Sequence, residues 1–260
     1  MNSKITIADL VEAKRQNRKI TAVSCYDYTT AKLVAGTDIQ MILVGDSAAQ
    51  AILGFDSTLP ATMDFMVALT AAVRRGAPNL FLVADMPFLS YQLGVTEAVK
   101  NAGRFVVQAG AQMIKIEASQ AYLDVIKAIS NAGMAVMAHI GIRPQSIGKT
   151  GKFKAEATTA EMGLELINIA EKTLDAGACA LLLEGTAAEV SEIITKRFDV
   201  PVIGCGSGAC CDGQILIAPD ILGLTQDAAP KFAKSYSKLA AASIDAFNEY
   251  SKEVQSGKFP

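Results

Sequence analysis

The chain has four carboxylates that each follow a short apolar run: Asp46, Asp85, Glu117 and Glu184. The runs before them have the length and composition of buried strands in a parallel sheet. One such carboxylate could cap a helix, but carboxylates after four different strands indicate a converging acidic site. In a closed parallel barrel the carboxyl ends of the strands surround one cavity, which is where such folds carry their chemistry.

Asp46 and Asp85 are the candidate metal ligands. Carboxylate oxygens at neighbouring strand ends suit Mg²⁺, which proteins hold with one or two carboxylates plus waters and substrate oxygens. The chain has a single histidine, which weakens a zinc or iron assignment. Each aspartate alone could be a helix cap in a loop, but the two together with Glu117 favour a metal site.

Two further positions extend this acidic site. Lys115 and Glu117 are two residues apart in a strand, so their side chains leave the same face. Burying both is costly unless they are paired or functional. We therefore expect Glu117 to support the metal and Lys115 to hold an anionic substrate; a buried ion pair that only fills the barrel is the alternative.

His139 follows the run at 135–138 and is either structural or part of the same rim. Glu184, flanked by apolar residues, suits a general base.

Composition limits the function classes. The 260 residues are close to the roughly 250 of a single (β/α)₈ barrel, and 51% of them are apolar. The net charge of −2 argues against a general nucleic-acid binder. No stretch approaches the roughly 18 apolar residues of a membrane span, and the N-terminus has no signal-peptide core. Five irregularly spaced cysteines fit reduced thiols, so we expect a cytoplasmic protein.

The elements that must position these residues alternate regularly. Strands are expected at 20–23, 41–44, 80–84, 113–116, 135–138, 180–183, 201–203 and 214–217. Helices are expected at 64–75, 96–109 with Thr96 as cap, 121–131, 159–175, 188–197 and 230–254, the last as one helix or a pair. Eight such units favour a closed barrel over an open doubly wound sheet. A capping box from Thr6 opens a short N-terminal helix. We predict an α/β protein with one (β/α)₈ TIM-barrel domain over residues 1–260.

Many stretches of the sequence resemble the ketopantoate hydroxymethyltransferase family. They are YDY at 26–28, LVGDS at 43–47, DSTLP at 56–60, AVRRGAP at 72–78, ADMPF at 84–88, IKIE at 114–117, PQS at 144–146, PVIG at 201–204, DGQ at 212–214 and PKF at 230–232. The resemblance runs from about residue 5 to the C-terminus. The set is far more specific than any single motif in it.

This resemblance implies a barrel of the phosphoenolpyruvate mutase and isocitrate lyase group. It also implies a reaction: transfer of a one-carbon unit from 5,10-methylenetetrahydrofolate to 3-methyl-2-oxobutanoate, giving 2-dehydropantoate on the route to pantothenate and coenzyme A. The expected partners are these small molecules and further copies of the chain, since the family forms homo-oligomers, often decamers. Mg²⁺ chelated by the substrate would stabilise the developing enolate as a Lewis acid.

The resemblance also implies residue roles. Asp46 and Asp85 are the expected Mg²⁺ ligands, with Glu117 beside the metal. The expected substrate-binding residues are Ser47, Asp46, Asp85, Lys115 and His139. Glu184 is the expected base that takes the proton from C3. Three carboxylates should therefore converge on one ion, while Glu184 faces the cavity without touching it.

The sequence departs from the family pattern at 154–158 and at 205–211, which includes the pair Cys210 and Cys211. These departures concern lid closure and folate contacts rather than the metal and base positions. Two alternatives remain at this point: a related Mg²⁺-dependent carbon–carbon lyase or mutase that acts on another 2-oxo acid, and a noncatalytic paralogue. The loop at 141–154 has no cysteine of the kind the lyases carry, and a structural barrel has no need of so much buried charge.

Overall fold

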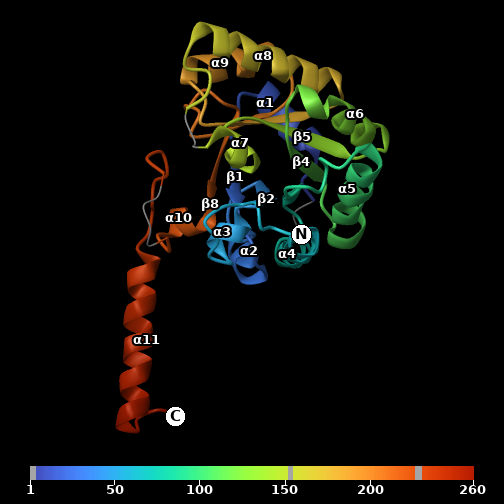
Figure 1. Cartoon of the computed structure of the whole chain (residues 1–260). Coiled ribbons are helices and arrows are strands. Elements are labelled where there is room, and N and C mark those ends of the chain that lie inside the picture. Colours follow the sequence, from blue (N-terminus) through green and yellow to red (C-terminus); the bar gives the residue numbers. More distant parts are fainter. Residues whose placement is uncertain (1–3, 152–154, 226–229) are drawn as a thin grey trace. The chain divides into compact units, whose positions relative to one another are not determined.

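Eight parallel strands close into a barrel in the order of the sequence in the computed structural model, which describes residues 4–151, 155–225 and 230–260 (Figure 1). The strands are β1 Ile20–Ser24, β2 Met41–Val44, β3 Phe81–Asp85, β4 Met113–Glu117, β5 Ala135–Gly141, β6 Ala180–Glu184, β7 Val202–Cys205 and β8 Gly213–Ile217. The predicted (β/α)₈ barrel is therefore confirmed.

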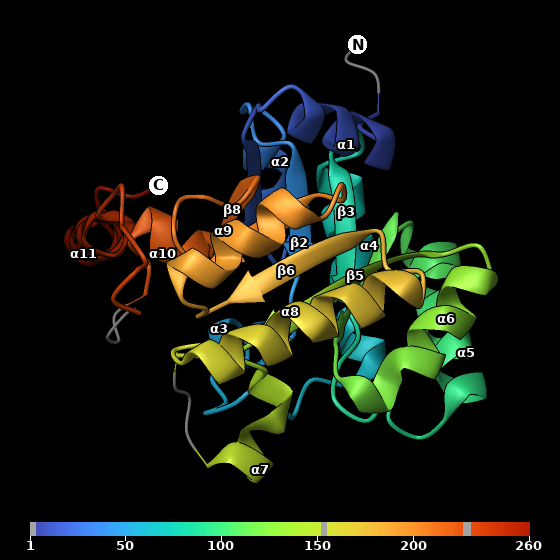
Figure 2. The same ribbon diagram turned by 90° about the horizontal axis from the view of Figure 1, so that it is seen from above.

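Helices alternate with the strands along the chain, and those between residues 28 and 197 lie outside the barrel (Figures 1 and 2). The helices are α1 Ile7–Arg15, α2 Tyr28–Val34, α3 Ala48–Ala51, α4 Met63–Gly76, α5 Val95–Ala109, α6 Leu123–Asn131, α7 Ile147–Thr150, α8 Ala160–Asp175, α9 Ala188–Arg197, α10 Ala218–Leu222 and α11 Leu239–Ser256. Two 3₁₀ turns, η1 Gln120–Tyr122 and η2 Pro144–Ser146, precede α6 and α7. None of the described helices is long and apolar enough to cross a membrane.

The barrel interior changes from apolar to charged along the strands. Every second strand residue points inward, because side chains alternate between the two faces of a strand. Near the amino ends these inward residues include Met41, Phe81 and Met113, which form one buried cluster with Leu10 and Ala13 of α1. The N-terminal helix therefore closes this end of the barrel. The predicted capping box at Thr6 is present, with Asp9 as its partner.

Several predicted element boundaries need correction. Gly94, not Thr96, is the N-cap of α5, because a positive φ of 123° there needs glycine. Residues 230–238 are not helical, and the last helix begins only at Leu239. β5 continues to Gly141, so His139 lies within the strand rather than after it. Residues 152–154, which belong to the loop considered at 141–154, fall outside the described residues.

The chain divides into two compact units, Met1–Ile215 and Leu216–Pro260. The first holds α1 through β7 and the start of β8, and with them all predicted site residues. The second holds α10 and α11. The prediction of a single domain over 1–260 stays a prediction.

Candidate active site

Charged side chains replace apolar ones inside the barrel at the carboxyl ends of the strands. The last inward residues of β3, β4 and β6 are Asp85, Glu117 and Glu184, and Lys115 and His139 lie within β4 and β5. Strand register brings them together, since Asp85 pairs with Lys115, and Glu117 with His139. The sequence prediction that these residues share one rim is therefore met.

A continuous row of polar contacts crosses this rim. Lys115 Nζ lies 2.8 Å from Asp85 Oδ2 and 3.2 Å from His139 Nδ1. On the other side of the ring, His139 Nε2 lies 3.2 Å from Glu184 Oε2. Nε2 has no hydrogen-bond partner among the described residues, so this last contact is a close approach rather than a hydrogen bond. The row thus links an acid on β3 to an acid on β6.

The loop after β2 brings Asp46 to the same place. The Asp46 backbone N–H donates to Asp85 Oδ2 at 3.1 Å, and both residues are buried. Gly45 keeps this region open, because a Cβ there would lie 2.9 Å from Ser47 Oγ and 3.9 Å from Asp85 Oδ2. Ser47 Oγ shares a 2.8 Å hydrogen bond with the buried Tyr26 hydroxyl, which orients it at the start of α3.

Gln145 in turn η2 connects the acids, and sequence reasoning did not single it out. Its backbone N–H donates to both Glu117 carboxylate oxygens, at 2.9 and 3.2 Å. Its side-chain amide donates to Asp46 Oδ2 at 2.9 Å and to the Met86 carbonyl at 2.8 Å. The Tyr91 hydroxyl donates to Gln145 Oε1 at 2.8 Å. The family resemblance of the PQS stretch at 144–146 was the one sequence signal that included this position. A single polar residue in a turn belongs to no helix or strand pattern that could indicate where its side chain points.

Burial and mutual repulsion shift the pKa values of these groups. Burial raises the pKa of Asp85 to about 7, against the opposing effect of Lys115. Burial likewise raises the pKa of Glu117 to about 8. Burial alone would lower the pKa of Lys115. The neighbouring carboxylates, of which Asp85 has the largest effect, outweigh burial and raise the pKa of Lys115 above its ordinary value. When the three buried carboxyl groups are ionised, they outnumber the one ammonium and leave an excess of negative charge.

The histidine is neutral in this setting. Burial lowers the pKa of His139, the Lys115 charge lowers it further, and Glu184 opposes both. An ammonium group can only donate hydrogen bonds, so His139 Nδ1 must accept from Lys115. The ring proton of the neutral histidine therefore belongs on Nε2. That proton is on the side of Glu184.

The donor set suits a hard divalent cation held by two carboxylates. Asp85 Oδ1 is buried and lacks a hydrogen-bond partner within the described residues, which leaves it available as a ligand. No group of three or more His, Cys, Asp or Glu side chains in the described ranges is arranged to hold a metal. The expected convergence of three carboxylates is therefore not seen, because both Glu117 oxygens face the Gln145 backbone. Two carboxylates remain, which is sufficient for Mg²⁺.

Replacing Gln145 with leucine tests its role as the connector. We expect a loss of about 1–3 kcal/mol in unfolding free energy, since the Asp46 carboxylate and the Tyr91 hydroxyl lose buried partners. We also expect metal affinity to change, because Asp46 is no longer held in place. Urea unfolding and calorimetric metal titration measure both effects. Gln50→Leu, at an exposed position of α3, is the control; equal effects in both variants would contradict the assignment.

A closed parallel barrel with acids, a lysine and a histidine at the carboxyl ends of its strands defines a (β/α)₈-barrel enzyme. Solved structures of similar fold include 2,3-dimethylmalate lyase of the PEP mutase/isocitrate lyase superfamily, with TM-score 0.62, 16% identity and coverage of 98% of this chain and 90% of that one. A phosphonopyruvate hydrolase complex with oxalate and Mg²⁺ has TM-score 0.63 and 15% identity, with 97% and 88% covered.

Sequence comparison gives the family. The family model of ketopantoate hydroxymethyltransferase matches residues 4–260. The 3-methyl-2-oxobutanoate hydroxymethyltransferase of Clostridium novyi is 46% identical over 99% of this chain and 94% of its own length. That of Enterococcus faecalis is 44% identical, with 99% and 94% covered. The chain belongs to the ketopantoate hydroxymethyltransferase family. Its likeness to lyases and mutases is a likeness of fold, so the lyase alternative gains no support.

Proposed function

We propose that this chain transfers a hydroxymethyl group from 5,10-methylenetetrahydrofolate to 3-methyl-2-oxobutanoate, giving 2-dehydropantoate for pantothenate synthesis. Family membership supports the reaction. The single observation that carries the mechanism is the row of contacts from Asp85 through Lys115 and His139 to Glu184. This row separates a cation-holding end at Asp85 from a proton-accepting end at Glu184.

Asp46 and Asp85 would hold the metal, with Mg²⁺ as the best match to their oxygens. When bound, it would supply Lewis acidity to the 2-oxo group of the substrate. Glu117, held by the Gln145 backbone, lies beside this pair rather than serving as a direct ligand, and a bound cation would favour its ionised form. Because the uncompensated charge of the site is negative, a divalent cation lowers the electrostatic cost of burying it.

Lys115 and Ser47 would hold the substrate carboxylate. Lys115 has three donors, of which two are directed at Asp85 and His139, so one remains for an anionic oxygen. Ser47 is oriented by Tyr26 and can donate its hydroxyl proton. Positive charge at Lys115 also favours the enolate oxygen that develops next to the carboxylate.

Glu184 would take the C3 proton as general base. Its side chain is 26% exposed, so it can meet both substrate and solvent. The neutral His139 ring lies 3.2 Å from this carboxylate, so it adds no positive charge beside the base. The electron pair of the C–H bond forms the C2–C3 double bond of the enolate while the carbonyl π pair moves to the 2-oxo oxygen, and C3 then bonds to the one-carbon unit. Both carbon–nitrogen bonds of that unit break, and water supplies the hydroxyl group. Tetrahydrofolate leaves with two new N–H bonds, whose protons come from Glu184 and from the water.

A transfer assay tests the reaction. The purified chain is mixed with 3-methyl-2-oxobutanoate, 5,10-methylenetetrahydrofolate and Mg²⁺, and the hydroxymethylated product is followed by mass spectrometry. We expect one product per folate consumed and no product after EDTA treatment. Folate consumption with no hydroxymethylated product would contradict the proposal.

Metal affinity should rise with pH. Protons and metal compete for the carboxylates, and ligands must be ionised to bind. Since the pKa values of Asp85 and Glu117 are raised to about 7 and about 8, we expect Mg²⁺ affinity to increase about tenfold per pH unit below pH 7 and to level off above pH 8. Calorimetry at pH 6, 7, 8 and 9 in two buffers also measures the released protons. An affinity independent of pH, with no proton release, would contradict these raised values.

We also propose that the chain works as a cytoplasmic homo-oligomer. The support for an oligomer is in α11. Its residues Phe247, Tyr250 and Val254 recur at helical spacing on one face and are 73%, 56% and 46% exposed. None of the described residues in this helix is buried. Such an apolar stripe is typical of an interaction surface.

Substituting the stripe should dissociate the oligomer. We expect the double variant Phe247→Ser, Tyr250→Ser to lower the molar mass measured by light scattering after size exclusion, because it removes the two largest apolar groups of the face. Glu249→Gln, on the opposite face of α11, should leave the mass unchanged. An unchanged mass in the double variant, or a monomeric wild type, would rule out this surface as the contact.

A further inference from the structure

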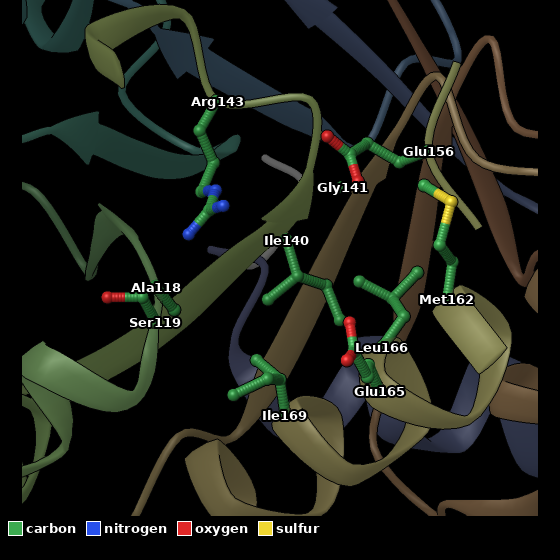
Figure 3. A pocket seen from close by; sticks show the side chains of 10 residues that line it. All are labelled: Ala118, Ser119, Ile140, Gly141, Arg143, Glu156, Met162, Glu165, Leu166 and Ile169. Carbon is green, nitrogen blue, oxygen red and sulfur yellow. The ribbon is translucent and has the colours of Figure 1, made fainter. Parts of the chain in front are cut away.

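A pocket lies outside the ring of strands, between the carboxyl end of β5 and helix α8 (Figure 3). Its volume is about 150 Å³. Ile140 of β5 and Leu166 and Ile169 of α8 form an apolar side, and Arg143 and Glu156 lie across the pocket from the helix. None of these residues belongs to the rim described above, so the pocket is unexplained by the metal and base chemistry.

The pocket adjoins the strand that carries the proposed base. Gly141 lines it and is the register partner of Glu184 in β6. The Ile142 N–H donates to the Glu184 carbonyl at 2.9 Å, and the Glu156 N–H donates to the Gly185 carbonyl at 2.9 Å. Gly141 has φ of 93°, and a Cβ there would lie 2.3 Å from the Glu184 carbonyl oxygen. The pocket therefore borders the backbone of the strand end that carries Glu184.

The lining defines the chemistry of the ligand. The volume is below the roughly 300 Å³ of pockets that enclose whole drug-sized ligands, so it fits one ring system. The apolar side offers a surface for a flat ring. Glu156 and the exposed Glu165 are acceptors only, whereas Arg143 is a donor only. The three together suit a heterocycle with several N–H donors and a carbonyl group.

We propose that this pocket binds the reduced pterin ring of the one-carbon donor, an inference that rests on the proposed hydroxymethyl transfer. The aminopyrimidinone edge of a pterin carries N–H donors beside a carbonyl, which Glu156, Glu165 and Arg143 complement. The one-carbon unit is attached at the opposite, pyrazine edge. With the pyrimidine edge inside the pocket, the one-carbon unit faces the end of β6 and the substrate beside Glu184.

Two variants test this assignment. Leu166→Phe fills the pocket, and Glu165→Gln removes one acceptor charge at an exposed position. For both we expect the KM for 5,10-methylenetetrahydrofolate and the Kd for tetrahydrofolate to rise about tenfold or more. The folate-free exchange of C3 deuterium in 3-methyl-2-oxobutanoate should stay within about twofold of wild type. Leu164→Phe is the control, because Leu164 lies on the same helix, is 69% exposed and is not part of the pocket.

The outcomes separate this inference from the function on which it rests. Unchanged KM and Kd in both variants would overturn the pterin pocket while leaving the transferase intact. A wild type that neither exchanges deuterium nor transfers the one-carbon unit would instead overturn the proposed function. If Leu166→Phe also loses exchange, its packing is disturbed, and Glu165→Gln alone decides: weaker folate binding supports the pocket, and unchanged binding refutes it.

Discussion

Replacing Glu184 with glutamine should reduce the rate of hydroxymethyl transfer by about 10²–10⁴-fold, the range typical of a general base. The amide keeps the size of the side chain but cannot accept the C3 proton. Mg²⁺ affinity should stay near that of wild type, because Glu184 is separated from Asp85 by Lys115 and His139. Steady-state kinetics and calorimetric metal titration measure the two quantities on the same preparation.

Glu189→Gln is the matched control for this variant, since Glu189 is exposed in the first turn of α9. It should have wild-type kinetics. A Glu184→Gln enzyme with less than a tenfold loss would exclude this side chain as the base. A variant that lost metal binding together with activity would indicate a metal-linked role for Glu184 instead.

Replacing Asp85 with asparagine should abolish measurable Mg²⁺ binding at millimolar concentrations and lower turnover by about 10³-fold or more. Lewis-acid stabilisation is worth several kcal/mol, and each 1.4 kcal/mol is about tenfold in rate. The variant removes the negative charge of the Asp85 carboxylate. Its Oδ1 is buried and has no hydrogen-bond partner among the described residues. The variant also removes the ion-pair partner of Lys115.

The loss of that ion pair requires a control for folding. Circular dichroism and urea unfolding should show the native fold, and Asp38→Asn, at an exposed loop position, should behave as wild type. Retained Mg²⁺ affinity in a folded Asp85→Asn enzyme would contradict the assignment of Asp85 as a ligand. In that case the metal, if required, would have to bind elsewhere on the rim.

The barrel could be predicted because its signals are local and repeated. Runs such as 41–44 and 180–183 are apolar throughout, as strands covered on both faces must be, and all eight expected strands are present. The short helices α2, α3 and α10 were missed, because they have too few turns to show a period. The start of α11 was placed too early, since the residues from 230 to 238 have no cap that separates them from the helix.

The acids of the site could be predicted from their positions at strand ends, but their partners could not. Lys115 lies on the same face as Glu117, yet it pairs with Asp85, because register places that residue directly opposite. Register between strands depends on long-range packing and is not visible in one strand. Gln145 was missed for a related reason, since its contacts join three separate loops that only the closed barrel brings together.

Exchange of the C3 hydrogen is the most direct measurement of the central claim. The wild-type chain is incubated in D₂O with Mg²⁺ and 3-methyl-2-oxobutanoate, without folate, and C3 deuteration is followed by NMR. We predict rapid exchange that EDTA abolishes and that Glu184→Gln slows greatly. Absence of exchange in the wild type with Mg²⁺ present would contradict the enolisation mechanism and the role of Glu184 within it.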